Sequence, residues 1–473
     1  MLRRRALYAV GIVLLLSGSI LYAMFFSPFI ASCGEPLGTA NVSRFQLPSV
    51  HFNAVTKFRL PDKVFPNGIT VASDGSVWFG EQAPPGIAHL YGNGTMVEYR
   101  WTPNYSLSTT SIWGVADWHG RIWVTDAAGG QIVSLDPSAS IVSAIKLSNA
   151  GAFPYTITLG LDDALWFTEL YGSKLGRINA QCKLTEYSIP TNFGGTPTQI
   201  EFVNSTYGYY VDAGNATNGL GEVLKFNTRQ FNPQPVGGNF RPQAASSLAL
   251  VGDGLWVAQH ASSNLAFYSF QTDSWTQFPT TPVDYVESTL PYFVAANGSL
   301  LWFNEHYANR IGVIDTDRST LTEYSLSNPP ANKTTQIDNA LTFALGKDRV
   351  WFTELTANYV GYVNATYKPD FVVSPSVQNL KLMPDQNVSL SFVVKSSPGE
   401  SLAIKLADNE NFTARPEKIR MRANLMATPR SNQKVFTISV GADRGLAPGS
   451  YVLLVTVSNG VINRGVYVQL LIA

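Results

Sequence analysis

The stretch WFNEHYANRIG, residues 302–312, places a carboxylate, an imidazole and a guanidinium close together. Glu305 and His306 are adjacent, and Arg310 follows shortly after them. Another copy of the stretch, GLWVAQH, ends in His260 at the equivalent place. An imidazole beside a carboxylate can act as a general base or bind a metal. The catalytic candidates are therefore His306, His260 and Glu305. The alternative is that these are loop histidines bonded to a carbonyl group or to water.

Acidic residues recur three places after the first aromatic residue of a repeated stretch such as LWFTE. Mg²⁺ and Ca²⁺ favour oxygen ligands of this kind. The carboxylates could therefore hold a divalent cation. Alternatively, each could accept backbone N–H groups and join neighbouring units. The candidate metal ligands are Glu81, Asp126, Glu169, Asp212 and Glu354, whereas Gln259 replaces the acid in one unit.

The stretches that carry these residues belong to a repeat that runs through most of the chain. Each unit reads as an apolar strand, a polar turn, an aromatic strand and two further strands, such as KLGRINA and LTEYSIP. The period matches a β-propeller blade of four antiparallel strands. We therefore predict an all-β fold with a seven-bladed β-propeller over residues 55–370. The first aromatic residues lie 43 to 49 positions apart, at Trp78, Trp123, Trp166, Tyr209, Trp256, Trp302 and Trp351.

In such a propeller the loops before the first strand and after the second strand open on one face, near the axis. The carboxylates and both histidines are expected there. Aromatic residues at the start of the innermost strands could stack on sugar rings or apolar ligands at this face. They could equally fill the central channel. The candidate ligand-binding residues at these strand starts are Asn67, Trp113, Tyr155 and Tyr292.

Two segments compete to complete the seventh blade. TKFRLP, residues 56–61, and KPDFVV, residues 368–373, both resemble the last strand of a unit. A strand in this position would leave the ring without an open edge. Beyond the repeat, residues 371–473 alternate apolar and polar positions around an APGSY turn. This pattern predicts a small Ig-like β-sandwich that serves as a spacer or adhesion module.

The N-terminus combines three arginines with a long uncharged apolar run, residues 6–31. This run exceeds the ~20 residues that cross a bilayer, and the arginines should stay cytoplasmic. We therefore expect residues 1–31 to be a cytoplasmic stub and transmembrane anchor, followed by an extracellular linker at 32–54. The bulk would then lie outside the cell membrane. Alternatively IASC, residues 30–33, resembles a lipobox in which Cys33 would be lipidated after cleavage.

An extracellular location agrees with the glycosylation sequons and the cysteines. Cys33 and Cys182 would both lie outside, where a disulfide can persist. Asparagine that crowds into turns is the alternative explanation of the sequons. The Asn-x-Ser/Thr positions are Asn41, Asn93, Asn104, Asn204, Asn215, Asn297, Asn332, Asn364, Asn387 and Asn411.

Composition excludes several classes of protein. The formal net charge is zero, so nothing favours nucleic acid as a partner. Charged residues make up only 14% of the chain, below the ~25% of average soluble domains. The sequence contains no GxSxG, HExxH, Walker or CxxC pattern.

Two units, residues 154–190 and 301–327, resemble the repeat of the virginiamycin B lyases, also called streptogramin lyases. The shared pattern runs P-x-G-I-T, a turn, L-W-F-T-E, N-x-I-G-R-I and T-E-Y-x-L-P. The resemblance covers about residues 56–370 and implies a seven-bladed propeller. It also implies elimination chemistry: a base removes a proton next to an ester carbonyl and a cyclic depsipeptide opens without water. A magnesium ion assists by polarising the ester.

The family's essential histidine lies in a P-H-x-I pattern at the start of an innermost strand. Here the corresponding positions hold other residues, among them Tyr292 in PYFV, and none is histidine. Two functions therefore remain open. One is metal-assisted lyase or hydrolase chemistry on a small cyclic ester, lactone or glycan. The other is a non-catalytic surface glycoprotein whose propeller face binds a ligand or an envelope protein.

Overall fold

The computed structural model describes residues 33–473, except 62–63, 104, 106–110, 215–218, 285, 328–339, 398–400, 409–418, 427–432 and 443–445. The expected membrane anchor, residues 1–31, lies outside this part of the chain. Within the described ranges, no helix combines the length and apolar character needed to cross a membrane.

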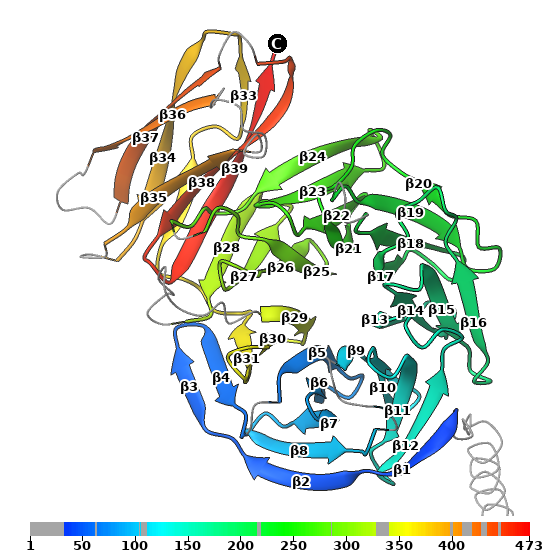
Figure 1. The fold of residues 1–473 in the computed structure, drawn as a ribbon. Coiled ribbons are helices and arrows are strands. Elements are labelled where there is room, and N and C mark those ends of the chain that lie inside the picture. The colour runs from blue at the N-terminus through cyan, green and yellow to red at the C-terminus, as the bar shows by residue number, and fades with distance from the viewer. Residues whose placement is uncertain are drawn as a thin grey trace, which may run out of the picture.

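Seven antiparallel sheets form a ring, with the C-terminal strands beside it (Figure 1). Each sheet is a meander of consecutive strands, ordered from the axis outward. Blade one contains β5 (Pro66–Val71), β6 (Val77–Gln82), β7 (Pro85–Leu90) and β8 (Thr95–Arg100); blade two contains β9 (Ile112–Trp118), β10 (Arg121–Asp126), β11 (Gln131–Asp136) and β12 (Ile141–Lys146); blade three contains β13 (Pro154–Leu159), β14 (Leu165–Glu169), β15 (Lys174–Ile178) and β16 (Leu184–Ser188).

The remaining blades repeat this arrangement, and the seventh is completed by an early strand of the chain. Blade four contains β17 (Pro197–Phe202), β18 (Tyr207–Asp212), β19 (Glu222–Asn227) and β20 (Gln234–Pro235); blade five contains β21 (Ala245–Val251), β22 (Gly254–Gln259), β23 (Asn264–Ser269) and β24 (Ser274–Pro279); blade six contains β25 (Pro291–Asn297), β26 (Leu300–Glu305), β27 (Arg310–Asp315) and β28 (Thr320–Ser325); blade seven contains β29 (Ala340–Leu345), β30 (Arg349–Glu354), β31 (Tyr359–Asn364) and β4 (Val55–Arg59).

The aromatic strand of each blade is buried on both faces, because neighbouring blades pack against it. Trp78 of blade one lies in one apolar cluster with Ile122 and Val124 of blade two. Trp123 similarly packs with Leu165 and other residues of blade three. Each fully buried large apolar side chain contributes about 1.5–3 kcal/mol to stability. The aromatic repeat is therefore the inter-blade core.

Glycine in the third strand has a steric reason. A Cβ atom built on Gly312 would come within 2.3 Å of the Phe303 ring, and one on Gly176 within 1.9 Å of Phe167. In both blades the phenylalanine of the second strand lies directly over the glycine of the third. The I-G and L-G pairs of the repeat thus mark places where only glycine fits.

The strand that closes the ring is β4. It pairs with β31 from Tyr359 opposite Arg59 to Val363 opposite Val55. The competing segment, residues 368–373, belongs elsewhere, since β32 (Val372–Pro375) pairs with a strand of the C-terminal domain. The ambiguity in the sequence is therefore settled in favour of the early segment.

The segment predicted as a linker, residues 32–54, forms strands instead. The structure places β1 (Glu35–Thr39) on β12, β2 (Asn41–Gln46) on β8 and β3 (Ser49–Phe52) on β4. These three strands, called the outer belt here, cover the outer edges of blades two, one and seven (Figure 1). An outer edge strand carries unpaired N–H and C=O groups, and the belt supplies partners for them.

A disulfide holds the start of the belt. Cys33 is bonded to Cys182 in the turn between β15 and β16, and its side chain is buried in the core of blades two and three. A sulfur atom in a disulfide cannot carry a lipid thioether. The structure therefore favours the disulfide over lipidation of Cys33.

The C-terminal domain consists of two sheets that share one core. The first contains β32, β34 (Asn387–Lys395), β37 (Gln433–Ala442) and β36 (Ile419–Met426). The second contains β39 (Ile462–Ile472), β38 (Gly449–Ser458) and β35 (Ala403–Asp408), with β33 (Asn379–Leu382) parallel to β39. Phe392 and Phe436 of the first sheet lie in the same apolar cluster as Val455 and Val468 of the second.

The sandwich, which the sequence suggested as a spacer or adhesion module, is joined to the propeller through a shared sheet. β39 pairs directly with β28, the outer strand of blade six, over five residue pairs from Thr320 to Tyr324. One sheet therefore runs without interruption from the propeller into the C-terminal domain (Figure 1). The outer edge of blade six is covered by this domain instead of by the belt.

Candidate functional site

The two histidines singled out in the sequence meet across adjacent blades. His260 follows β22 and His306 follows β26, and the distance from His260 Nε2 to His306 Nδ1 is 2.9 Å. Equivalent backbone hydrogen bonds hold them: His260 N donates to Ala244 O, and His306 N donates to Leu290 O. Each acceptor lies just before the innermost strand of its blade. Repeat symmetry therefore brings the imidazoles together.

Tyrosine rings surround this pair. The Tyr292 ring centroid lies 4.7 Å from that of His260 and 5.2 Å from that of His306, on which it stacks. Tyr307, 40% exposed, lies 6.1 Å from His306. We call His260, Tyr292, His306 and Tyr307 the His–Tyr cluster. It unites three predicted site residues with Tyr307, which the sequence reasoning missed.

The cluster is electrically neutral at neutral pH. Burial lowers the pKa of His260 to about 4. Burial, and then repulsion from His260, lowers the pKa of His306 to about 3. Burial raises the pKa of the Tyr292 phenol above its usual range. Both imidazoles are therefore uncharged, and one of them donates a hydrogen bond to the other.

One imidazole nitrogen of the cluster has no partner. His306 Nε2 is buried and makes no hydrogen bond within the described structure. When His306 Nδ1 donates to His260, this Nε2 atom carries a lone pair and can accept a proton. In the opposite tautomer Nε2 is a donor. The hydrogen bond to His260 thus controls the chemistry of the free nitrogen.

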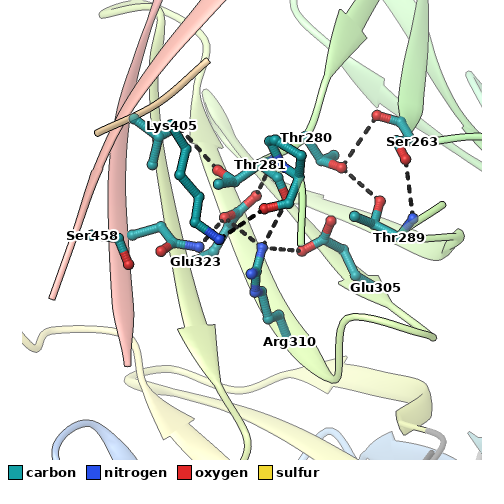
Figure 2. A network of polar contacts seen from close by, with 12 residues as sticks. Ser263, Thr280, Thr281, Thr289, Glu305, Arg310, Glu323, Lys405 and Ser458 are labelled. Atoms are coloured by element: carbon teal, nitrogen blue, oxygen red, sulfur yellow. Dashed lines mark hydrogen bonds and ion pairs between the residues drawn. The ribbon is translucent and has the colours of Figure 1, made fainter. Parts of the chain in front are cut away.

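Glu305 does not join the histidines. Its carboxylate lies 3.7 Å from Arg310 Nη1, which also approaches Glu323 at 3.3 Å (Figure 2). His306 lies in the turn after β26, where its ring contacts His260 and Tyr292. Burial and the Glu323 charge raise the pKa of Glu305 to about 8. The structure therefore places the Glu305 carboxylate beside Arg310, and the catalytic role expected for it with His306 stays a prediction.

The other repeated carboxylates are also committed within their own blades. Glu81 lies 3.5 Å from Arg100, and Glu354 lies 2.6 Å from Lys57. Asp126 accepts hydrogen bonds from Ser111, Tyr105 and Gln131, and Asp212 accepts them from Thr196. Glu169 lies beside Glu186, and burial and that neighbour raise its pKa to about 8.

These residues do not fit a Mg²⁺ or Ca²⁺ site. All of them are 0% exposed, and their partners lie in the same blade. Across the described part of the chain, no three His, Cys, Asp or Glu side chains gather closely enough to hold a metal ion. The arrangement instead joins the second strand of these blades to the loop before the first strand, or to the third or fourth strand.

The links between blades come from the preceding position. Thr125 Oγ1 donates to Tyr155 O at 2.8 Å, and Thr168 Oγ1 donates to Thr198 O at 3.3 Å. Asn304 Nδ2 donates to Leu341 O at 2.9 Å and also to Ala340 O. The sequence reasoning assigned this role to the carboxylates. A recurring hydroxyl or amide one residue earlier was the signal that could have identified it.

The other candidate residues at the inner-strand starts, Asn67, Trp113 and Tyr155, do not belong to the His–Tyr cluster. Trp113 and Tyr155 lie 5.0 Å apart and, with Phe153 and the exposed Tyr171, form an aromatic patch on blades two and three. Phe153 and Tyr171 lie outside the repeated positions, so periodicity did not identify them. Asn67 is wholly buried, and neither of its amide atoms has a partner within the described residues.

The described sequons lie on strands and turns of both the propeller and the C-terminal domain. Asn41, Asn93, Asn204, Asn297 and Asn387 are exposed, and Asn364 is partly buried. The other four, Asn104, Asn215, Asn332 and Asn411, lie outside the described residues.

Comparison with known proteins finds similarity to the virginiamycin B lyases in part of the repeat. Residues 51–225 match the model of the virginiamycin B lyase family. Virginiamycin B lyase from Nocardia farcinica is 30% identical over 125 residues, which is 26% of this chain and 42% of that protein. The chain thus matches less than half the length of this curated relative.

Solved structures of the same enzymes share the fold. Selenomethionine-substituted virginiamycin B lyase from Staphylococcus aureus aligns with a TM-score of 0.54 at 20% identity, over 69% of this chain and 99% of that one. A catalytically inactive histidine-to-alanine variant from the same species, solved with quinupristin, gives 0.54 at 21% identity, over 66% and 98%. A streptogramin B lyase structure gives 0.53 at 23% identity, over 66% and 97%.

Proposed function

We propose that this chain, a virginiamycin B lyase-like β-propeller, opens a small cyclic ester at the His–Tyr cluster. The observation that carries the proposal is the unpartnered Nε2 atom of His306, on an imidazole oriented by its hydrogen bond to His260. A neutral imidazole whose Nε2 atom carries the lone pair can act as a general base.

The reaction is an elimination within the ester. His306 Nε2 accepts the proton from the carbon next to the one that bears the ester oxygen. The electron pair of that C–H bond forms a carbon–carbon double bond. The C–O bond then breaks, and its electron pair leaves with the carboxylate. Nothing is added, so the ring-opened product is an isomer of the substrate.

Tyr292 occupies the position of the family's essential histidine, and His306 could supply the imidazole in its place. Tyr292 stands at the start of the innermost strand of blade six, and the His306 ring of the same blade stacks on it. An imidazole from the loop after the second strand thus lies beside that position. Since the repeated carboxylates do not fit a divalent cation, the proposed step uses no metal.

Turnover of quinupristin, the compound present in a structural relative, tests this proposal. The purified full chain should convert it to a linear isomer of equal mass, as followed by liquid chromatography and mass spectrometry. His306→Gln should reduce kcat/KM by about 10²-fold or more, which is the usual contribution of a general base. His51→Gln changes a histidine on the outer belt and is the matched control.

Full turnover by His306→Gln would refute the assignment of the base. A product one water heavier than the substrate would show hydrolysis in place of elimination. Activity that disappears with a chelator and returns with Mg²⁺ would show that a metal takes part despite the paired carboxylates.

The second candidate function is binding without turnover. It is favoured by Tyr292 at the family's catalytic position, and by the aromatic patch around Trp113, Tyr155 and Tyr171, which provides stacking surface without any titrating base. It predicts saturable binding of an intact ligand to the propeller face. Unchanged quinupristin after long incubation, together with measurable binding, would favour this alternative.

We further propose that the propeller is displayed outside the cell membrane on an N-terminal anchor. The uncharged run at residues 6–31, the arginines before it and the exposed sequons support this. The disulfide between Cys33 and Cys182 also suits an oxidising compartment. Protease treatment of intact cells should remove the propeller, and glycosidase treatment should change its mobility on a gel. An intact chain after protease treatment would contradict this location.

A further inference from the structure

A cavity of about 250 Å³ lies between blade five and the C-terminal domain, and none of its lining residues belongs to the His–Tyr cluster. Asn264 at the start of β23 lines it from the propeller, and Asp408 at the end of β35 lines it from the sandwich. Exposed Glu287 also contributes, so the cavity reaches the surface there. Neither domain forms this cavity alone.

The amide of Asn264 distinguishes the cavity from ordinary interface space. Asn264 is 1% exposed, and neither its oxygen nor its nitrogen has a hydrogen-bond partner within the described residues. A buried amide without partners destabilises a protein. An amide retained in that state, beside a cavity, indicates that something other than the protein bonds to it.

The other blades provide an internal comparison. Residues at the equivalent place, the first of the third strand, have partners: Gln131 bonds to Asp126, Lys174 to Glu186 and Arg310 to Glu323. Blade five replaces the charged cluster with amides, and Gln259 and Gln277 bond to each other at 3.0 Å. Asn264 lies beside these amides, but its own side chain makes no hydrogen bond within the described residues.

The wall beside Asn264 is an ordered set of hydroxyl groups. Thr280 Oγ1 and Thr289 Oγ1 are 2.7 Å apart, and both residues are 1% exposed. Thr289 N donates to Ser263 Oγ at 3.0 Å, and Thr280 Oγ1 donates to Ser263 O at 3.2 Å. Figure 2 shows these bonds next to Glu305. This wall is therefore held in place before any ligand arrives.

Contacts between the domains hold the opposite wall. Lys405 Nζ donates to Pro282 O at 3.1 Å, and Tyr467 OH donates to Pro279 O at 3.0 Å. Thr281 and Thr456 are joined through their hydroxyl groups at 3.0 Å. These bonds lie on both sides of the interface and bring Asp408 opposite blade five. Hydrogen bonds between the two domains therefore fix the shape of the cavity.

We propose that this cavity binds a single sugar unit or a similar small polyol. Its polar residues supply amide and carboxylate groups, which suit neighbouring hydroxyls because each hydroxyl both donates and accepts. Pro279, Val283 and Ala407 supply apolar surface for the C–H side of a sugar ring. The described lining contains two carboxylates and no lysine or arginine, which disfavours an anion. The volume lies below the ~300–1,000 Å³ of drug-sized sites.

Saturation-transfer NMR on the full chain tests the proposal, with methyl glycosides of glucose, galactose, mannose and N-acetylglucosamine as probes. At least one should receive magnetisation from the protein. Asn264→Leu should raise its Kd roughly tenfold or more, because a buried amide pairs with hydroxyls. The same variant should melt at an equal or higher temperature, since it removes an unpaired buried amide. Ser143→Ala removes another unpartnered buried group, in blade two, and should leave the Kd unchanged.

Asp408→Asn provides a second variant from the other domain and should also weaken binding. The proposal fails if none of the four glycosides binds, in which case the polar cavity holds water only. It also fails if the Asn264→Leu variant binds as tightly as the parent chain. A loss of thermal stability in Asn264→Leu would show that the amide supports the fold and would overturn the argument from its missing partners.

Discussion

At the scale of single residues, the site depends on two imidazoles that are kept neutral. His260 and His306 share a hydrogen bond and lie against Tyr292. The same surroundings that leave His306 Nε2 available also make protonation of either ring unfavourable. The buried His260–His306 pair should therefore make the stability of the folded protein decrease at acidic pH.

The free energy of unfolding should fall as the pH drops below about 6.5. In the folded chain the pKa values are about 4 for His260 and about 3 for His306, against 6.5 for free histidine. The unfolded chain therefore binds more protons between these values, and stability present above pH 6.5 is lost toward pH 4. Each histidine should contribute on the order of 1–2 kcal/mol of this loss at pH 5.

Urea denaturation at pH 7 and pH 5 measures this effect. The double variant His260→Gln and His306→Gln should show a smaller difference between the two pH values than the parent chain. An equal difference in both would mean that other groups cause the acid sensitivity.

Asn304 is the second residue whose role is specific. It accepts a hydrogen bond from Phe293 N in its own blade and donates to Ala340 O and Leu341 O of the next. Asn304→Ala should destabilise the chain by about 1–3 kcal/mol, because it leaves buried backbone groups unpaired. Asn304→Thr should lose less, since threonine makes this link in blades two and three. Equal losses in the two variants, measured by urea denaturation, would contradict this.

At the scale of single elements, each blade is stabilised by close contact between its second and third strands. In blades three, six and seven the phenylalanine of the second strand covers the glycine of the third, as Phe303 covers Gly312. Trp302, one residue earlier, faces the seventh blade and the C-terminal core. A strand of this kind tolerates little change on either face.

Gly312→Ala should therefore destabilise blade six strongly. The new Cβ atom would meet the Phe303 ring at 2.3 Å, and overpacking typically costs about 1–3 kcal/mol. Gly92→Ala is the control, because its Cβ atom would meet nothing closer than 3.7 Å and the backbone there is ordinary. Thermal unfolding of the two variants checks this prediction. Similar melting temperatures would show that the Phe303 ring can move aside.

At the scale of the whole molecule, a further strand pairs with the outer edge of each of blades one, two, six and seven. The outer belt covers three of them, and β39 of the sandwich covers the fourth. Both additions come from segments that the repeat does not include. The propeller is therefore one part of a larger bonded unit that starts at Cys33 and ends in β39.

Removal of the disulfide should loosen one end of this unit. Cys33 and Cys182 are 149 residues apart in sequence, so the bond closes a long loop. Cys182→Ser should lower stability by about 2–5 kcal/mol and increase hydrogen exchange in β1. Reduced parent chain should match the variant, and reductant should leave the variant itself unchanged. Undiminished protection of β1 in the variant would show that strand pairing alone holds the belt.

The sequence by itself determined the repeated elements, because their signals are local. Alternation, turn residues, the aromatic wedge and the glycine of the third strand all depend on neighbours within about 45 residues, which is the span of one blade. The same locality made the two histidines recognisable as equivalent positions in neighbouring units. It also identified the carboxylates as a repeated set.

Only the tertiary structure decided how these positions act. Packing of blade five against blade six brings His260 within 2.9 Å of His306, whereas Glu305 lies beside Arg310. Pairing of edge strands made a belt from the expected linker and joined the sandwich to blade six. The cavity at Asn264 exists because of that junction. The periodic pattern of the sequence reflects contacts within one blade. Contacts between distant segments depend instead on which strand edges and faces stay unpaired after every blade has formed.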